Sequence, residues 1–111
     1  MSCEPKIIYQ VGVYVTVAGV PFRVAKVSGG KMKVWELAVQ NITATPITAN
    51  LQFFEGFPSP GSLGVPLSFQ VLVQQFQMWS KPGDVVQDDV YLIDTIGGTT
   101  LSVEARTQSL G

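Results

Sequence analysis

Few side chains in this sequence are suited to chemistry, because the chain has no histidine. General acid–base work would fall to carboxylates, lysine or tyrosine. The single cysteine, Cys3, has no imidazole to activate its thiol, and it can form no disulfide within the chain. Glu36 and Glu55 would form a carboxylate pair if their strands were paired neighbours, but no sequence feature identifies a pocket between them.

Four aspartates are the candidates for a metal site: Asp84, Asp88, Asp89 and Asp94. Carboxylate oxygens of this kind bind calcium. Their spacing lacks the regular ligand positions and the central glycine of a calcium loop, so a solvated turn explains them better. The glycine pairs at 29–30 and 97–98 join predicted strands, and no helix N-terminus follows them to bind an anion. We therefore predict that the protein is not an enzyme and needs no cofactor or metal.

The composition points to a protein that is covered by neighbours. Of its 111 residues, 46% are hydrophobic and 14% are charged, against about 25% charged in an ordinary soluble domain. Charged side chains keep a free monomer soluble. The net charge of −1 and the scattered basic residues argue against nucleic-acid binding. No apolar run approaches the roughly 18 residues of a membrane span, and we expect no secretory signal.

Apolar residues at every second position predict strands along the whole chain. The clearest run is 7–17, whose odd-numbered residues are apolar and are expected to face the core. About eight strands and no helix are expected, with 31–41 and 47–53 as antiparallel neighbours because their connection is short. Two sheets must then pack face to face, so we predict a single antiparallel β-sandwich domain over 1–111, with a small β-barrel as the alternative. The predicted core comprises Val11, Val13, Val15, Trp35, Leu37, Val39, Leu51, Phe53, Phe69, Val71, Leu101 and Val103.

Aromatic residues outside the apolar pattern are the candidates for binding. They lie on the polar phase of strands or in loops, where exposed rings anchor protein partners, stack on sugars, or cover the open edges of a sandwich. Gln and Ser surround them, which favours protein contact over a sugar site. The segment 56–66 holds three prolines, which lower the entropy lost when a loop is ordered on binding. The predicted partner contacts are Phe57, Pro58, Pro60, Phe76 and Trp79.

Two stretches of sequence resemble a known group of proteins. The first, at 33–51, has the pattern L-x-V-x-N, a threonine-rich turn and then T-x-x-L; the second, at 97–105, ends in a closing strand of the type G-x-x-L-x-V-x-A. This resembles small β-sandwich virion proteins of tailed bacteriophages, which are capsid cement or decoration subunits and tail or fibre components. The resemblance covers roughly residues 31–105. Thr99 stands where that group often has aspartate.

The resemblance implies a structural role in many copies, with no cofactor. We interpret the chain as a non-enzymatic virion protein, above all a capsid cement or decoration protein that bridges major capsid subunits on the capsid surface. The alternatives are a tail or fibre component and a carbohydrate- or receptor-binding module. The expected partners are the major capsid protein or other virion subunits, including further copies of this chain, and not nucleic acid or membrane. Such a protein would be made in the host cytoplasm.

Overall fold

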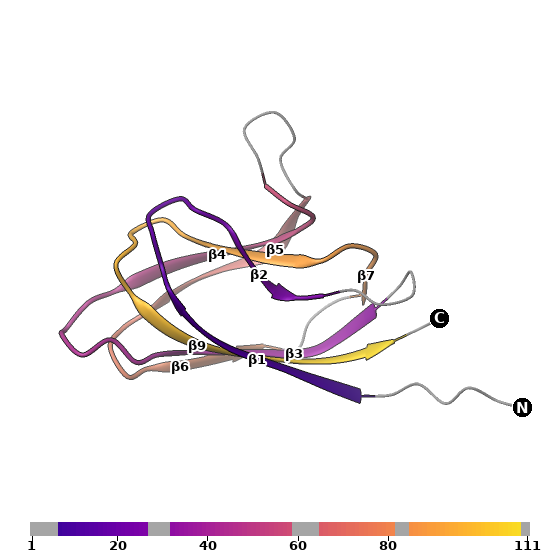
Figure 1. Ribbon diagram of the computed structural model, residues 1–111, viewed down its shortest axis with the longest axis horizontal. Helices are drawn as coiled ribbons and strands as arrows, with labels where there is room; N and C mark the ends of the chain where they lie inside the picture. Colours follow the sequence, from indigo (N-terminus) through magenta and orange to yellow (C-terminus); the bar gives the residue numbers. More distant parts are fainter. Residues whose placement is uncertain (1–6, 27–31, 59–64, 82–84, 110–111) are drawn as a thin grey trace, which may run out of the picture.

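The computed structural model describes residues 7–26, 32–58, 65–81 and 85–109, and every regular element in them is a strand (Figure 1). Among these residues no helix has the length and apolar character needed to cross a membrane. The strands are β1 (Ile7–Val15), β2 (Phe22–Ala25), β3 (Met32–Asn41), β4 (Ala49–Glu55), β5 (Val65–Val73), β6 (Met78–Lys81), β7 (Val85–Val86), β8 (Val90–Asp94) and β9 (Thr100–Ser109).

These strands form two antiparallel sheets packed as a sandwich, which confirms the predicted fold class over the barrel. One sheet has the order β1-β9-β3-β6, with β7 also on β3, and the other has the order β2-β8-β4-β5. Both β6 and β7 pair with β3, at 37–40 and 32–33 respectively. They act as one interrupted edge strand, which gives the sandwich about the number of strands that the sequence predicts, although the apolar pattern groups Val86 with Val90 and Leu92 of β8 and not with β6.

The pairing is nested like a long hairpin that has been rolled up. The innermost pair is β4–β5; around it come β3 with β6 and β7, then β2–β8, and finally β1–β9. Successive pairs alternate between the two sheets. This is the jelly-roll arrangement, in which two Greek keys close one core.

The core lies between the sheets and contains most of the predicted inward residues. Confirmed as buried are Leu37, Val39, Leu51, Phe53, Leu101 and Val103. Val71 is half-buried and packs against this cluster. The side chains of Trp35 and Phe69 lie outside the described part of the structure. The register between β3 and β9 shifts between Val34 and Glu36, and Val34 is buried.

The prediction for β1 is wrong, because its valines face outward. Val11, Val13 and Val15 are 68%, 63% and 74% exposed. Gln10 and Tyr14 turn inward and are half-buried, and Thr16, just beyond the strand, is buried. Alternation reveals that a strand has two unlike faces, but it does not say which face is inside.

The predicted pairing of 31–41 with 47–53 is also wrong. These segments correspond to β3 and β4, which lie in different sheets. The chain turns at 18–19, where Gly19 has a φ of +74°, and the strands on either side, β1 and β2, also belong to different sheets. A short connection can arch from one sheet of a sandwich to the other, so its length does not prove a hairpin.

Candidate assembly interface

Two of the predicted partner contacts are exposed aromatic side chains. Phe57, just beyond β4, is 54% exposed and meets Tyr91 edge to face, with ring centroids 5.2 Å apart. Phe76, in the turn between β5 and β6, is 63% exposed. Its φ of 57° lies in the left-handed region that residues other than glycine rarely adopt. Both rings are therefore available to a partner.

These two rings lie at opposite ends of the same sheet. Phe57 follows Glu55, which pairs with Val65, whereas Phe76 follows Val73, which pairs with Ala49. The strand between these ends spans about 20 Å, at roughly 3.3 Å per residue. In Figure 1 the two ends of the β4–β5 strand pair lie far from each other. The two rings are therefore separate contact points and do not form one cluster.

Two of the remaining predicted contacts, Trp79 and Pro58, are less accessible. Trp79 is half-buried, packs against the core and stacks on Phe53 with ring centroids 5.6 Å apart. Pro58 is buried, and the neighbouring Gly56 donates its N–H to the carbonyl of Asp89, so the predicted exposed loop begins inside the fold. Pro60 lies outside the described residues. Trp79 and Pro58 therefore serve mainly to stabilise the fold.

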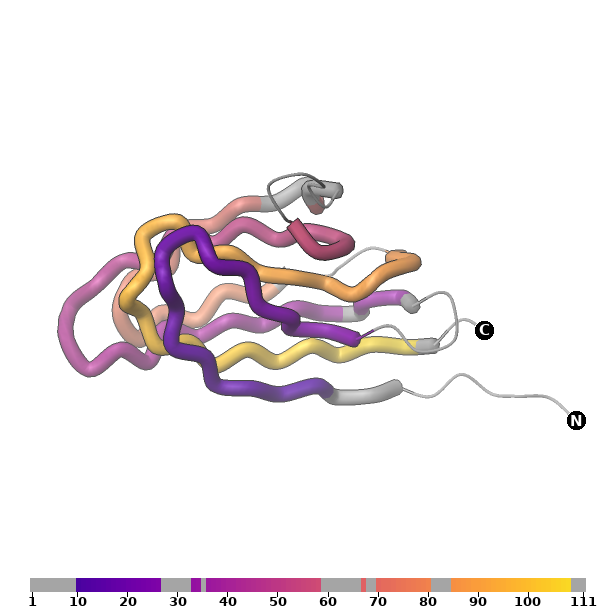
Figure 2. The backbone as a smooth tube through the Cα atoms, turned by 45° about the horizontal axis from the view of Figure 1, so that its top comes forward, coloured from indigo at the N-terminus to yellow at the C-terminus, as the bar shows by residue number. Residues whose placement is uncertain are grey.

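The sequence interpretation missed a continuous apolar surface on β1, which we call the valine stripe (Val11, Val13 and Val15). Its cross-strand neighbours on β9 are Glu104, Ser102 and Thr100, so the outer face of this sheet changes from polar to apolar at its margin. Figure 2 shows β1, in indigo, running along that margin beside the yellow β9. Exposed apolar patches of this kind mark interaction surfaces.

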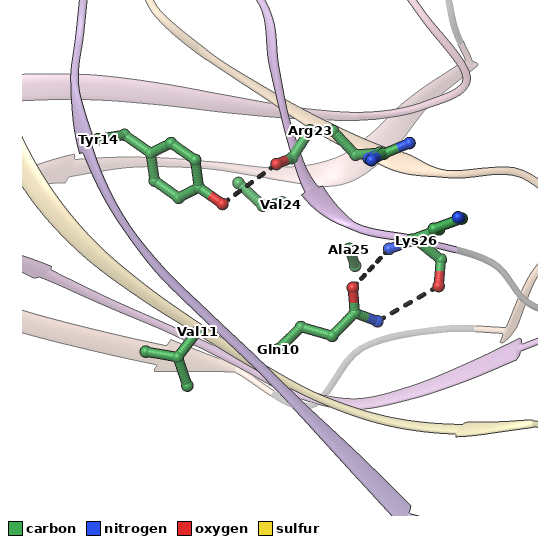
Figure 3. A pocket seen from close by; sticks show the side chains of 7 residues that line it. All are labelled: Gln10, Val11, Tyr14, Arg23, Val24, Ala25 and Lys26. Atoms are coloured by element: carbon green, nitrogen blue, oxygen red, sulfur yellow. Dashed lines mark hydrogen bonds between the residues drawn. The ribbon is translucent and has the colours of Figure 1, made fainter.

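Contacts from the inward side of β1 to β2 hold the valine stripe outward. The amide of Gln10 accepts the N–H of Lys26 at 2.7 Å and donates to its carbonyl at 3.2 Å. The hydroxyl of Tyr14 donates to the carbonyl of Arg23 at 3.2 Å, and its ring stacks on Phe22. Figure 3 shows Gln10 and Tyr14 reaching toward β2 while Val11 points away.

These contacts line a pocket of about 450 Å³ between β1 and β2. Its polar side chains are Gln10, Tyr14, Arg23 and Lys26. The Gln10 amide and the Tyr14 hydroxyl are already hydrogen-bonded to β2 backbone. The pocket walls therefore join the two edge strands, and this set of residues contains no nucleophile beside a base.

The candidate metal and carboxylate sites are dispersed by the fold. Asp94 is fully buried at one end of β8, whereas Asp88 and Asp89 precede its other end, and Asp84 lies outside the described residues. No group of three or more His, Cys, Asp or Glu in the described ranges could hold a metal ion.

The proposed carboxylate pair is not formed either. Glu36 lies on β3 and Glu55 on β4, in different sheets. Glu55 instead accepts the backbone N–H of Gln87 at 2.8 Å. The two glutamates therefore do not face each other across paired strands, in agreement with the absence of any sequence feature that indicates a pocket between them.

Asp94 lies where three connections between strands meet, and it binds groups in or beside each of them. Its carboxylate accepts the Thr16 hydroxyl at 2.7 Å and the backbone N–H groups of Asn50 and Ile96 at 3.2 and 3.0 Å. Its carbonyl accepts the N–H of Gly19 at 3.0 Å. The side chain that the sequence suggested for a solvated turn is thus a buried structural hub.

A substitution at Gly97, in the β8–β9 turn beside this hub, should destabilise the fold. Gly97 has a φ of +78°, and an added Cβ would clash with the backbone N of Ala18. We expect Gly97→Ala to cost at least about 2 kcal/mol of unfolding free energy, measured by urea denaturation. Gly19→Ala is the matched control, since φ is similar there and nothing lies within 4 Å. Equal losses in the two variants would contradict the role of the clash.

Comparison with known proteins gives a fold likeness. No known protein family and no curated protein matches the sequence. The structure is similar to a chain of the Bacillus endospore appendages, described as a novel family of disulfide-linked pili, with a TM-score of 0.54 and 14% identity over 98% of this chain and 96% of that one. A chain of the cyanophage Pam1 capsid asymmetric unit gives a TM-score of 0.45 and 13% identity, over 96% and 85%. At 14% identity the likeness to the spore-appendage chain shows the fold and not the function.

Proposed function

We propose that this protein is a non-enzymatic structural subunit of a multi-copy assembly. The observation that carries the proposal is the valine stripe, three neighbouring valines that are each more than 60% exposed on the outside of a sandwich. Leaving such a surface in water is unfavourable, and it is removed from water when a neighbouring protein covers it. The low charged fraction of 14% supports the same conclusion for the surface as a whole.

The finer role that we propose is a capsid cement or decoration protein on the virion of a tailed bacteriophage. The sequence patterns at 33–51 and 97–105 support it, and exposed apolar surface suits a subunit that bridges major capsid proteins. A second candidate, a subunit of a surface fibre, is favoured by the likeness to the spore-appendage chain, which extends over nearly the whole of both chains.

Electron microscopy of purified particles, with and without this protein, tests the proposal. A cement protein adds regularly spaced density outside the capsid shell, and its removal lowers the resistance of the particle to heat or chelation. A fibre subunit is instead found along filaments. Recovery of the protein from neither shell nor filaments, as a free monomer at its native concentration, would contradict both roles.

The two exposed aromatic rings provide a further prediction about binding to the assembly. Because Phe57 and Phe76 are more than half exposed, Phe57→Ser and Phe76→Ser should leave the domain folded. Each lost anchor should weaken incorporation by about 30-fold, which corresponds to about 2 kcal/mol. Occupancy on reconstituted particles, measured by quantitative gel densitometry against input protein, reports the loss.

The matched control is Ile96→Ser, because Ile96 is similarly exposed, at 48%, in a different turn. We expect it to be incorporated like the wild type. If Phe57→Ser and Phe76→Ser also reach full occupancy, the aromatic rings are not partner contacts, and the valine stripe is left as the candidate surface.

A further inference from the structure

A sandwich of two open sheets has four edges, and three of them here are protected against pairing with another chain. The β2 edge is four residues long, with a register shift between Arg23 and Ala25. The β5 edge carries Pro66, and its pairing with β4 is irregular nearby. The third edge is divided into β6 and β7, of four and two residues. Short strands, bulges and prolines are the means by which natural proteins prevent edge-to-edge association.

The fourth edge, β1, has none of these protections. It is nine residues long and pairs with β9 through nine consecutive positions without a register shift. Its sequence, IIYQVGVYV, contains no charged residue and no proline. A long, regular, uncharged edge strand is the kind that pairs with another chain.

The backbone groups of β1 that have no partner among the described residues belong to the residues that form the valine stripe. Just after the strand, Thr16 exchanges hydrogen bonds with the β9 side: it donates to the Thr99 carbonyl at 2.8 Å and accepts from Gly98 N–H at 2.9 Å. In an antiparallel ladder, successive residues point these groups alternately toward and away from the partner. Even-numbered residues of β1 therefore face β9. The N–H and C=O of Val11, Val13 and Val15 point to the free edge.

We propose that β1 pairs with β1 of a second copy of this chain, antiparallel about a two-fold axis at Val13. In this register Val13 faces Val13, and Val11 faces Val15, of the other copy, so each exposed valine meets a valine. Such β-branched cross-strand pairs are favourable, and the absence of charge on β1 means that no like charges are brought together. On the inward side Gly12 lies opposite Tyr14, a small residue against a large one.

A second copy is the occupant that fits best because the strand is complementary to itself, whereas the other edges of this chain are protected. The interface is small: a strand about 30 Å long covers a strip of about 300 Å² on each copy. A stable interface takes about 800 Å² per partner, so the isolated pair should be weak. In an assembly, contacts elsewhere hold the copies together and raise their effective concentration. The inference thus rests on the proposed function and names the partner of one surface.

Sedimentation equilibrium of the full chain tests this pairing. All variants carry Cys3→Ser, so that no disulfide between copies contributes. The Cys3→Ser protein should approach the mass of a dimer between about 10 μM and 1 mM, as expected for a weak interface. Val13→Pro removes an N–H that points to the free edge, not to β9, so it should fold and raise the dissociation constant at least tenfold. Val13→Lys should do the same by placing two charges face to face.

The control is Leu72→Lys, because Leu72 is 61% exposed on β5, away from β1; its dimerisation should not change. Circular dichroism verifies that each variant is folded. Under mild oxidation, Val13→Cys should crosslink to itself, since paired Cα atoms about 5.5 Å apart allow a disulfide. Val15→Cys should not, because Val11 of the other copy lies opposite.

A monomer at all concentrations, or dimers that Val13→Pro and Val13→Lys leave intact, would overturn the β1 pairing. That failure is separate from failure of the proposed function. If both the Cys3→Ser protein and its Val13→Lys variant are monomeric in solution but still join particles, the subunit role stands without β1 pairing. If β1 pairs in solution but the protein is found in no assembly, the pairing stands and the proposed function fails.

Discussion

Replacing Phe53 with alanine is expected to cost about 3–5 kcal/mol of the free energy of unfolding. Phe53 is 1% exposed near the centre of β4. Its cross-strand partner on β8 is Leu92, and Trp79 of the other sheet stacks on its ring. Truncation removes the largest fully buried side chain among the described residues and leaves a cavity that the two sheets can close only by shifting toward each other. A small domain has about 5–15 kcal/mol of stability in total, so this loss is a large fraction of it.

Urea denaturation followed by tryptophan fluorescence measures this loss, because Trp79 reports on the same contact. Phe57→Ala is the control, a truncation of the same ring at an exposed site close in the sequence, and it should cost less than about 1 kcal/mol. A similarly small loss for Phe53→Ala would mean that the ring does not occupy the core and that the register of β4 is wrong.

The strands that form the core could be predicted from alternation. In β4 and β9 the apolar residues Leu51, Phe53, Leu101 and Val103 all turn inward. Both strands lie in the interior of a sheet. Polar residues alternate with the apolar ones along them, so the hydrophobic effect turns the apolar face toward the core. The two-sheet architecture followed from the number and spacing of these strands.

The orientation of β1 could not be predicted in this way. Both of its faces are uncharged, and side-chain hydrogen bonds decide between them. Gln10 and Tyr14 satisfy backbone groups of β2, and the Thr16 hydroxyl reaches Asp94. These contacts join residues up to 78 positions apart, so no local pattern reveals them. The valine stripe, which now carries the functional proposal, was for this reason hidden among the predicted core residues.

The candidate contacts were predicted only by residue type. Exposed rings at Phe57 and Phe76 follow from their positions off the apolar phase. Their separation to opposite ends of the sheet depends on the antiparallel pairing of β4 with β5. Trp79 has the same sequence signature but stacks on Phe53, because β6 is a short edge strand that covers the core from the side.

Replacing Asp94 with alanine is the second change for which we expect a large effect, a loss of about 3–4 kcal/mol. The carboxylate is fully buried, and three donors end on it: the Thr16 hydroxyl and the N–H groups of Asn50 and Ile96. Alanine leaves the buried Thr16 hydroxyl and the two partly buried N–H groups without this acceptor. The connections β1–β2, β3–β4 and β8–β9 all pass this point, so the loss is shared by both sheets.

Asp94→Asn is the matched control, because asparagine keeps the size of the side chain and one carbonyl oxygen. That oxygen still accepts the two backbone N–H groups, while the amide meets Thr16, whose hydroxyl already accepts the N–H of Thr99 at 2.9 Å. We expect a smaller loss, about 1–2 kcal/mol. Thermal and urea unfolding of both variants measure the difference. If Asp94→Ala costs less than about 1 kcal/mol, water replaces the carboxylate without loss, and the turns are held together by their backbone bonds and Gly97 instead.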